Sequence, residues 1–356
     1  MRHRYVPIVS CKKAELNALA ELPQRVRDAV LPLVDIRDPE PSRIVPGRRH
    51  KPFSPSERLK SLADDPKNGL VGTFSGTDRF LLDVGRVNPH ILERGQHPAS
   101  WLLLFCKDLG LEPIPVIGRS REPDYRKAIA RVVRDVGNGA CIRVLKDHLT
   151  AGSSGLAHIL HDLDLPRAQV DLVIDLEDVP IDRGRFMSRV AHELLEGFRP
   201  LTSWRSVSLG AGAFPRLVSD HIDYDSHGTL ARTDWQTWQH TCSELGGTDV
   251  AFGDYGVVSP SDSPGWLGAA NIRYARQHDW LVIRGTRPNP APPSGDYNRL
   301  ARQLMATQSD FDATHCPGCV FISSMSEKTG GNATQWRQAG FSHHFASVLD
   351  LLGIAA

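Results

Sequence analysis

Short β-rich runs alternate with helical segments along most of the chain, and this alternation restricts the fold to the α/β class. Eight runs have strand character, and they start near residues 5, 31, 80, 112, 140, 170, 206 and 249. Most of the connections are long enough to hold a helix, as parallel strands require. Since eight parallel strands close a TIM-type barrel, the sequence predicts a (β/α)8 barrel. An open doubly wound sheet is the alternative, but it usually carries a glycine-rich turn after its first strand, and Ser10-Cys11-Lys12-Lys13 has no glycine.

The barrel is predicted to form a single domain over residues 1–356, with two additions. A Pro/Arg-rich insertion spans 37–79, and a C-terminal extension of 268–356 is expected to pack on the barrel. In the extension, the runs at 271–274 and 280–285 flank His278-Asp279 and indicate a hairpin. Two helices are expected after it, at 297–308 and 343–352. Within the barrel, 14–30 is predicted to be one amphipathic helix.

Composition excludes several functional classes. The chain has 42 basic and 41 acidic residues and a formal charge of +1, so no overall attraction to nucleic acid or to an anionic membrane is expected. Neither a signal-type apolar run nor a stretch of about 20 apolar residues occurs, which favours a cytoplasmic protein without membrane association. Six cysteines in so long a chain favour reduced thiols.

Several predicted strands end in carboxylates, which a barrel would gather at one opening. They are Asp35, Asp83, Asp175, Glu177 and Asp254. Converging carboxylates suit a divalent cation or a general acid/base pair, although an aspartate after a strand is also a common helix cap. Asp175 and Glu177 close the most apolar strand, and their two-residue spacing keeps both on one side of an extended segment.

Cations and histidines form a second set of candidates. Arg119, Arg143, Arg273 and Arg284 lie in or just after strand-like runs. The planar guanidinium suits phosphate or carboxylate, but pairing with the acids above is an equal alternative. The pair His343-His344 is expected at the start of the last helix, where one could move a proton. The catalytic candidates are therefore Asp175, Glu177, Asp254 and His343.

The segment His315-Cys316-Pro317-Gly318-Cys319 contains the one CxxC motif of the sequence. A structural zinc site needs four ligands, often from two such pairs, and no second pair exists. We interpret the motif as a tight turn before the strand-like run 320–324. Zinc bound with one of the two later histidines is the alternative. Nucleophile-elbow, Walker, HExxH and dinucleotide motifs are absent.

Six segments together resemble the Beta protein family of temperate and satellite phages and their bacterial relatives. They are YVPIVSCKKAELNAL (5–19), VLPLVDI (30–36), FGDYGV (252–257), ANIRY (270–274), WLVIRG (280–285) and GNATQWRQAGFSHH (331–344). The resemblance draws attention to Lys12 or Lys13 and to Glu15 after the first strand. It also implies a context of anti-phage defence, with a partner protein from a neighbouring gene. This chain departs from the family at Cys11 and in the insertion 39–58.

Three functional hypotheses follow. The first is a defence component that binds a phosphate-bearing or otherwise anionic ligand, such as a nucleotide or nucleic acid, at the barrel mouth. Its candidate ligand-binding residues are Lys12, Lys13, Glu15, Arg143, Tyr255, Arg273, Arg284, Arg337 and His344. The second is a metal-dependent phosphodiester or nucleotide hydrolase, in which Asp83, Asp175, Glu177 and Asp254 hold a divalent cation. The third is a non-catalytic scaffold with Trp235, Trp238 and Trp266 as anchors.

Overall fold

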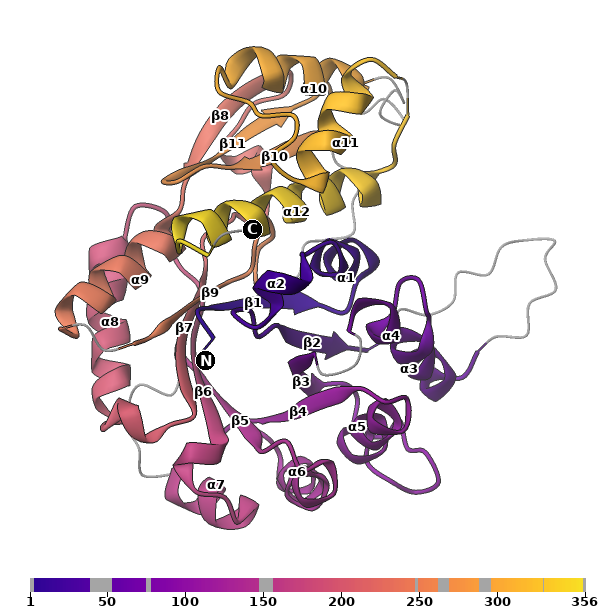
Figure 1. Ribbon diagram of the computed structural model, residues 1–356, viewed down its shortest axis with the longest axis vertical. Coiled ribbons are helices and arrows are strands. Elements are labelled where there is room, and N and C mark those ends of the chain that lie inside the picture. The colour runs from indigo at the N-terminus through magenta and orange to yellow at the C-terminus, as the bar shows by residue number, and fades with distance from the viewer. Residues whose placement is uncertain are drawn as a thin grey trace.

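The computed structural model describes residues 3–38, 53–74, 78–146, 156–246, 249–261, 269–287, 296–328 and 330–354. Eight parallel strands form a closed barrel in the order β1-β2-β3-β4-β5-β6-β7-β9, with helices around it (Figure 1). Their bounds are β1 Tyr5–Ser10, β2 Leu33–Arg37, β3 Arg79–Arg86, β4 Glu112–Ile117, β5 Ala140–Leu145, β6 Val170–Asp178, β7 Ser206–Gly212 and β9 Ala251–Asp254. The predicted barrel is confirmed, and the pairing of β1 with β9 rules out the open sheet.

The outer helices follow local signals in the sequence. They are α1 Lys13–Ala20, α2 Gln24–Arg27, α3 Pro55–Asp64, α4 Leu70–Thr73, α5 Pro98–Asp108, α6 Pro123–Val136, α7 Leu156–Leu163, α8 Gly184–Glu196 and α9 Thr233–Glu244. The prediction of a single helix over 14–30 is wrong. Pro23, which has no N–H to donate, lies between α1 and α2 and separates them.

The predicted insertion contains two of these helices, α3 and α4. Pro55 occupies the first turn of α3, and Ser54 and Glu57 form a capping box at its start. Residues 39–52, which include most of the Pro/Arg-rich part, lie outside the described residues.

The barrel interior is apolar in its middle and polar at the carboxyl ends of the strands. Leu33, Leu81, Cys141 and Val173 belong to the inner apolar cluster. Because side chains alternate along a strand, the residue two positions further on each of these strands also faces inward. Those residues are Asp35, Asp83, Arg143 and Asp175, and all are buried. The mouth of the barrel thus has a charged floor.

The C-terminal extension builds a small sheet with its own core (Figure 1). The predicted hairpin is confirmed as β10 Asn271–Ala275 and β11 Asp279–Arg284, which pair antiparallel. A third strand, β8 Ser226–Ala231, pairs with β11 and was not predicted. Its sequence, SHGTLA, offers little apolar alternation. One strand of the extension, β8, therefore comes from the connection between β7 and α9 and not from the C-terminal part of the chain.

Three helices complete the extension, namely α10 Asp296–Thr307, α11 Pro317–Ser326 and α12 Ala333–Leu351. The prediction of a strand at 320–324 is wrong, because that run lies inside α11. The predicted start of the last helix at residue 343 is also wrong. Asn332 caps α12 together with Gln335, so the two histidines lie in the middle of the helix. Since α12 contacts α1, α11 and β10, it joins the extension to the barrel.

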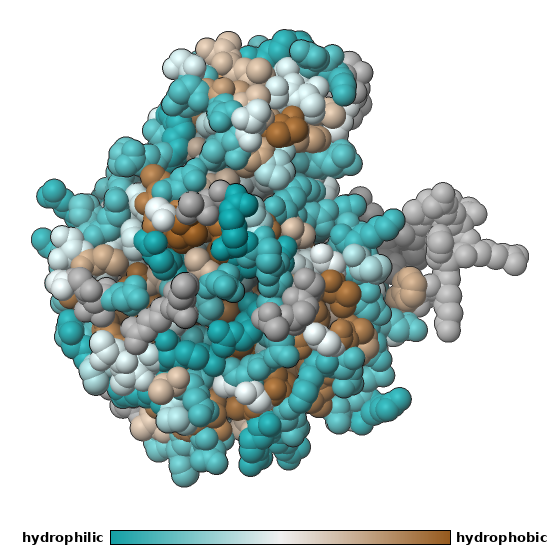
Figure 2. Space-filling model, in the orientation of Figure 1, coloured by the Kyte–Doolittle hydropathy of each residue, from teal (hydrophilic) through white to brown (hydrophobic). Residues whose placement is uncertain are grey.

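The surface visible in Figure 2 is mostly hydrophilic, with small apolar patches between the polar side chains. Among the residues that the structure describes, no helix combines the length and the apolar character that crossing a bilayer requires.

Candidate functional site

Arg143 lies at the centre of the barrel mouth and joins carboxylates from three other strands. Its Nε and Nη2 atoms donate to Asp175 Oδ2 at 2.9 and 2.7 Å, and its Nη1 donates to Asp83 Oδ2 at 2.8 Å. Asp35 Oδ2 lies 3.6 Å from Nη1. Arg143 is 3% exposed, so these charge-assisted contacts form in a site from which water is excluded.

Tyr255 closes the network from the end of β9. Its hydroxyl donates to Asp175 Oδ2 at 2.6 Å and accepts from Arg143 Nη2 at 3.0 Å. Burial, reinforced by the negative charge of Asp175, raises the pKa of Tyr255 well above its ordinary value. The phenol therefore keeps its proton and remains a hydrogen-bond donor.

Asp83 is bound by two arginines. Besides Arg143, the guanidinium of Arg121 contacts both carboxylate oxygens of Asp83, at 2.7 and 2.6 Å. Burial alone would raise the pKa of Asp83, but Arg121 and Arg143 lower it below its ordinary value. The sequence analysis named Arg119 as a candidate and missed Arg121. Both arginines follow the end of β4, so the position after a strand could have indicated either of them.

Asp35 differs from its neighbours because its carboxylate has no hydrogen-bond partner. Both oxygens are buried without a donor, and the ion contacts at 3.4 Å to Arg86 Nε and 3.6 Å to Arg143 Nη1 are long. Burial, followed by the charge of Asp83, raises the pKa of Asp35. A donor supplied from outside the protein would satisfy this group.

A rim of partly exposed charged side chains surrounds this floor. Arg86 contacts Asp35 and lies 3.9 Å from Glu177, and 33% of its side chain is exposed. Lys146 donates to the backbone carbonyl of Asp178. Glu177 has a left-handed φ of 53° at a register shift in β6, so the expected extended geometry after Asp175 is wrong. Such strain often marks functional positions.

Glu15 lies beside the mouth, behind the end of β1. Its carboxylate accepts a hydrogen bond from the backbone N–H of Ser10. Burial raises the pKa of Glu15 to about 7, while the nearby charges of Lys12, Arg337 and Arg37 oppose the rise. Lys12 and Lys13 are exposed. The family resemblance drew attention to Lys12, Lys13 and Glu15, and of these three residues only Glu15 is buried.

Asp254 does not join the carboxylates at the mouth. Alternation turns Tyr255 into the barrel and Asp254 outward, toward α12. There Asp254 accepts from Tyr5 Oη at 2.9 Å and pairs with His344 Nε2 at 2.6 Å, and Arg232 lies 3.5 Å away. Burial lowers the pKa of His344, although the negative charge of Asp254 and its hydrogen bond oppose this decrease. His344 thus belongs to a buried cluster between barrel and extension.

The other predicted site residues do not take part in the network around Arg143. Arg273 donates to the carbonyl of Val257 at 2.5 Å, and Arg284 donates to the carbonyl of Ile222. Arg337 is exposed on α12, and His343 faces Cys316 and Cys319. The expectation that all the candidate residues meet in one pocket is therefore wrong, because the extension forms its own core.

The mouth does not provide the cation site that the hydrolase hypothesis required. Asp175 accepts hydrogen bonds from Arg143, Tyr255 and the backbone N–H of Glu177, and Asp83 accepts from two arginines and from the backbone N–H of Gly85. Removing these carboxylates from their arginines would leave buried charges unpaired. With Asp254 on the outside of the barrel, the proposed ligand set does not assemble.

The tryptophans of the scaffold hypothesis have structural contacts. Trp235 and Trp238 both pack against Phe252, with ring centroids 4.9 and 5.5 Å from it. Trp238 Nε1 also donates to the carbonyl of Val250 at 2.9 Å. Trp266 lies outside the described residues. Core packing thus accounts for the two tryptophans that the structure describes.

A cavity of about 430 Å³ opens at the opposite end of the barrel, near Pro32 and Arg79. Two of its charged lining residues, Arg27 and Asp78, pair with each other at 2.5 Å. In barrels of this type, active sites occupy the carboxyl ends of the strands and the amino ends serve stability. We therefore consider the mouth the better candidate site despite the size of this cavity.

Comparison with known proteins supports the family resemblance. A model of the Beta protein family matches residues 5–350. Among solved structures, the N-terminal domain of a candidate aldolase from Bacteroides vulgatus has 11% sequence identity and a TM-score of 0.35, covering 99% of this chain and 97% of that one. A similarity this low carries no argument about activity. No curated protein matches the chain.

Proposed function

This chain belongs to the Beta protein family, and we propose that it binds a small anionic ligand, bearing phosphate or carboxylate, at the mouth of its barrel. The observation that carries the proposal is Asp35, a buried carboxylate at the mouth that lacks a hydrogen-bond donor and lies among arginines. A ligand that combines an anionic group with a hydroxyl or amino donor complements both features.

The cationic side of the site supports binding of an anion. Arg86 and Arg121 lie between the buried network and solvent, with 33% and 16% of their side chains exposed. The raised pKa of Asp35 shifts this group toward its neutral form. Arg86, Arg121 and Arg143 lie among Asp83, Asp175 and Glu177, and Arg86 and Arg121 keep part of their side chains exposed. These two guanidinium groups can donate charge-assisted hydrogen bonds to a phosphate or carboxylate.

The buried oxygens of Asp35 favour a ligand that also donates a hydrogen bond. A buried acceptor without a partner costs about 1–3 kcal/mol, so a ligand hydroxyl or amino group that donates to it gains a comparable amount. Ribose 5-phosphate carries both kinds of group and serves as a probe. Inorganic phosphate and ribose each test one half of the proposal.

We would measure binding of ribose 5-phosphate, inorganic phosphate and ribose by isothermal titration calorimetry. We expect ribose 5-phosphate to bind most tightly. Arg86→Gln should weaken it about 10- to 100-fold, because a hydrogen bond to a charged group contributes about 1.5–3 kcal/mol. Arg189→Gln, on the exposed side of α8, is the matched control and should bind like the wild type. Asp35→Asn should reduce the advantage of ribose 5-phosphate over phosphate.

Two results would contradict this proposal. One is the failure of every probe to bind at millimolar concentration. The other is binding that Arg86→Gln and Asp35→Asn leave unchanged, since it would place the ligand elsewhere.

We also propose a role in anti-phage defence, beside a protein encoded by a neighbouring gene. Its support is family membership alone. The test is co-expression of the tagged chain with each adjacent gene product, followed by affinity purification and size-exclusion chromatography. A stable complex with a neighbour would support the proposal. A chain that elutes alone with every neighbour would count against a partner.

A further inference from the structure

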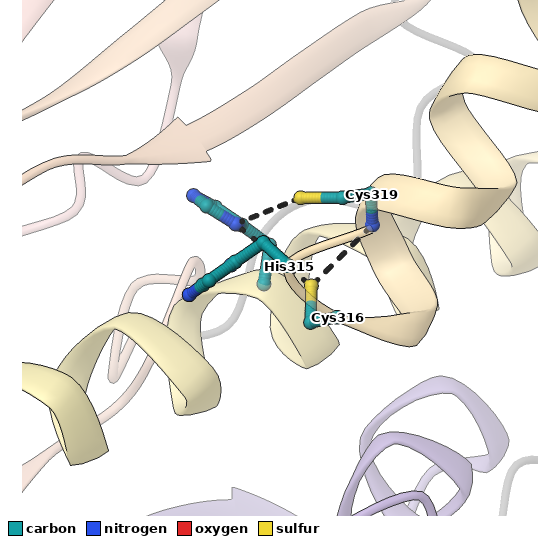
Figure 3. Close-up of side chains that lie close together, drawn as sticks. His315, Cys316 and Cys319 are labelled. Atoms are coloured by element: carbon teal, nitrogen blue, oxygen red, sulfur yellow. Dashed lines mark hydrogen bonds between the residues drawn. The ribbon is translucent and has the colours of Figure 1, made fainter. Parts of the chain in front are cut away.

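Four side chains with metal-ligating atoms converge in the C-terminal extension. His315, Cys316, Cys319 and His343 each offer one nitrogen or sulfur, and all four atoms lie within 4.8 Å of one another. Figure 3 shows the first three at the start of α11, beside α12. We propose that these residues form a structural zinc-type site with two sulfur and two nitrogen ligands.

The geometry suits a tetrahedral ion. Cys319 Sγ lies 3.3 Å and Cys316 Sγ 3.9 Å from His343 Nδ1. With Zn–S bonds of about 2.3 Å and Zn–N bonds of about 2.0 Å, ligand atoms of a tetrahedral site lie about 3.3–3.8 Å apart. The two pairs made by His343 lie close to that spacing, and the widest pair among the four atoms, at up to 4.8 Å, would have to close by about 1 Å around an ion. Two thiolates and two imidazoles also match the preference of zinc for sulfur and nitrogen ligands.

The start of α11 holds the two sulfurs in place. Cys316 is the N-cap of this helix, and its sulfur accepts from the backbone N–H of Cys319 at 3.4 Å. Gly318 presses against α12, where its N–H donates to Ser342 Oγ at 3.2 Å and a Cβ would collide with the carbonyl oxygen of Ala339. This close approach places both sulfurs next to His343 and corrects the interpretation of the CxxC as an isolated turn.

Both histidines have outer partners that orient the ring for metal binding. His343 Nε2 lies 2.8 Å from the carbonyl oxygen of Ala275, to which it must donate, so Nδ1 carries a free lone pair toward the sulfurs. His315 Nε2 lies 2.7 Å from Asp350 Oδ2, which leaves its Nδ1 as the coordinating atom. A carbonyl or carboxylate behind a ligating histidine is the usual second layer of zinc sites.

The environment indicates a structural role. Cys316, Cys319 and His343 are buried, and four protein ligands leave no open position for a substrate. The ion would cross-link α11 to α12 within the small core of the extension. Small cores gain most from such a cross-link, because their apolar burial alone is limited.

The test begins with the metal content of the full-length chain, purified without chelators and measured by inductively coupled plasma mass spectrometry. We expect about one zinc per wild-type chain and less than about a tenth of that in a Cys316→Ser/Cys319→Ser variant. Cys242→Ser, which replaces a half-buried thiol in α9, is the matched control and should retain the metal. His315→Asn, which alters the exposed ligand, should lower zinc affinity by at least about tenfold against a competing chelator.

Cobalt provides a readout that does not depend on how the variants fold. Wild-type chain stripped of metal and titrated with Co²⁺ should develop the visible bands of tetrahedral cobalt and thiolate charge-transfer absorption in the near ultraviolet. Three results would overturn the proposal: no uptake of zinc or cobalt by the wild type, a Cys316–Cys319 disulfide in protein purified under reducing conditions, or full zinc content in the double serine variant.

Discussion

Replacing Arg143 with methionine removes the cation that contacts Asp35, Asp83 and Asp175 together. Asp83 retains its two contacts with Arg121, so the loss falls mainly on Asp175 and Asp35. Removing one partner of a buried ion pair typically costs about 3–5 kcal/mol, because the remaining charge is left without compensation. We expect Arg143→Met to lower the free energy of unfolding by this amount near pH 7.

The assay is urea denaturation followed by circular dichroism and tryptophan fluorescence. The Arg143→Met/Asp175→Leu double variant should recover about half of the loss or more, because neither charge of that pair remains. Arg189→Met, on the exposed side of α8, is the control and should change stability by less than about 0.5 kcal/mol.

The loss of unfolding free energy in Arg143→Met should also depend on pH. Without Arg143, a buried carboxylate has a higher pKa in the folded than in the unfolded chain, so the destabilisation is largest at high pH and shrinks as the carboxylates protonate. A loss below about 1 kcal/mol, or a deficit that grows as pH falls, would refute the idea that Arg143 compensates these charges.

Two further predictions concern Glu15 and Gly256. Glu15 has a folded pKa of about 7 against an ordinary value of 4.5, so its contribution to stability is present below pH 4.5 and is lost as pH rises to about 7. Glu15→Gln should therefore stabilise the chain above pH 7, by up to about 3 kcal/mol in urea denaturation, and a gain that is equal at pH 4.5 would argue against the raised pKa. Gly256 has a φ of 62°, and a Cβ there would lie 2.5 Å from Phe341 Cε1. Gly256→Ala should lower the free energy of unfolding by about 2–4 kcal/mol, whereas Gly246→Ala, also at positive φ but in open space, should cost only about 1–2 kcal/mol.

The barrel and the position of its mouth could be predicted from the sequence. Strand and helix periods are local properties, and eight alternations with crossover connections leave few ways to arrange a parallel sheet. The same reasoning located Asp83, Arg143 and Asp175 at strand ends, but it also placed Asp254 with them, which the structure does not. Element bounds were less accurate where a proline or a cap decided them, as at Pro23 and Asn332.

Tertiary structure alone decided which of these groups meet. Asp254 and Tyr255 are neighbours in sequence, yet one faces α12 and the other the barrel interior, which depends on the register of β9 between β1 and β7. Cys316 and Cys319 approach His343 because α11 packs on α12. Local patterns specify the elements, but contacts between residues far apart in the chain depend on how whole elements pack, and no short stretch of sequence encodes that packing.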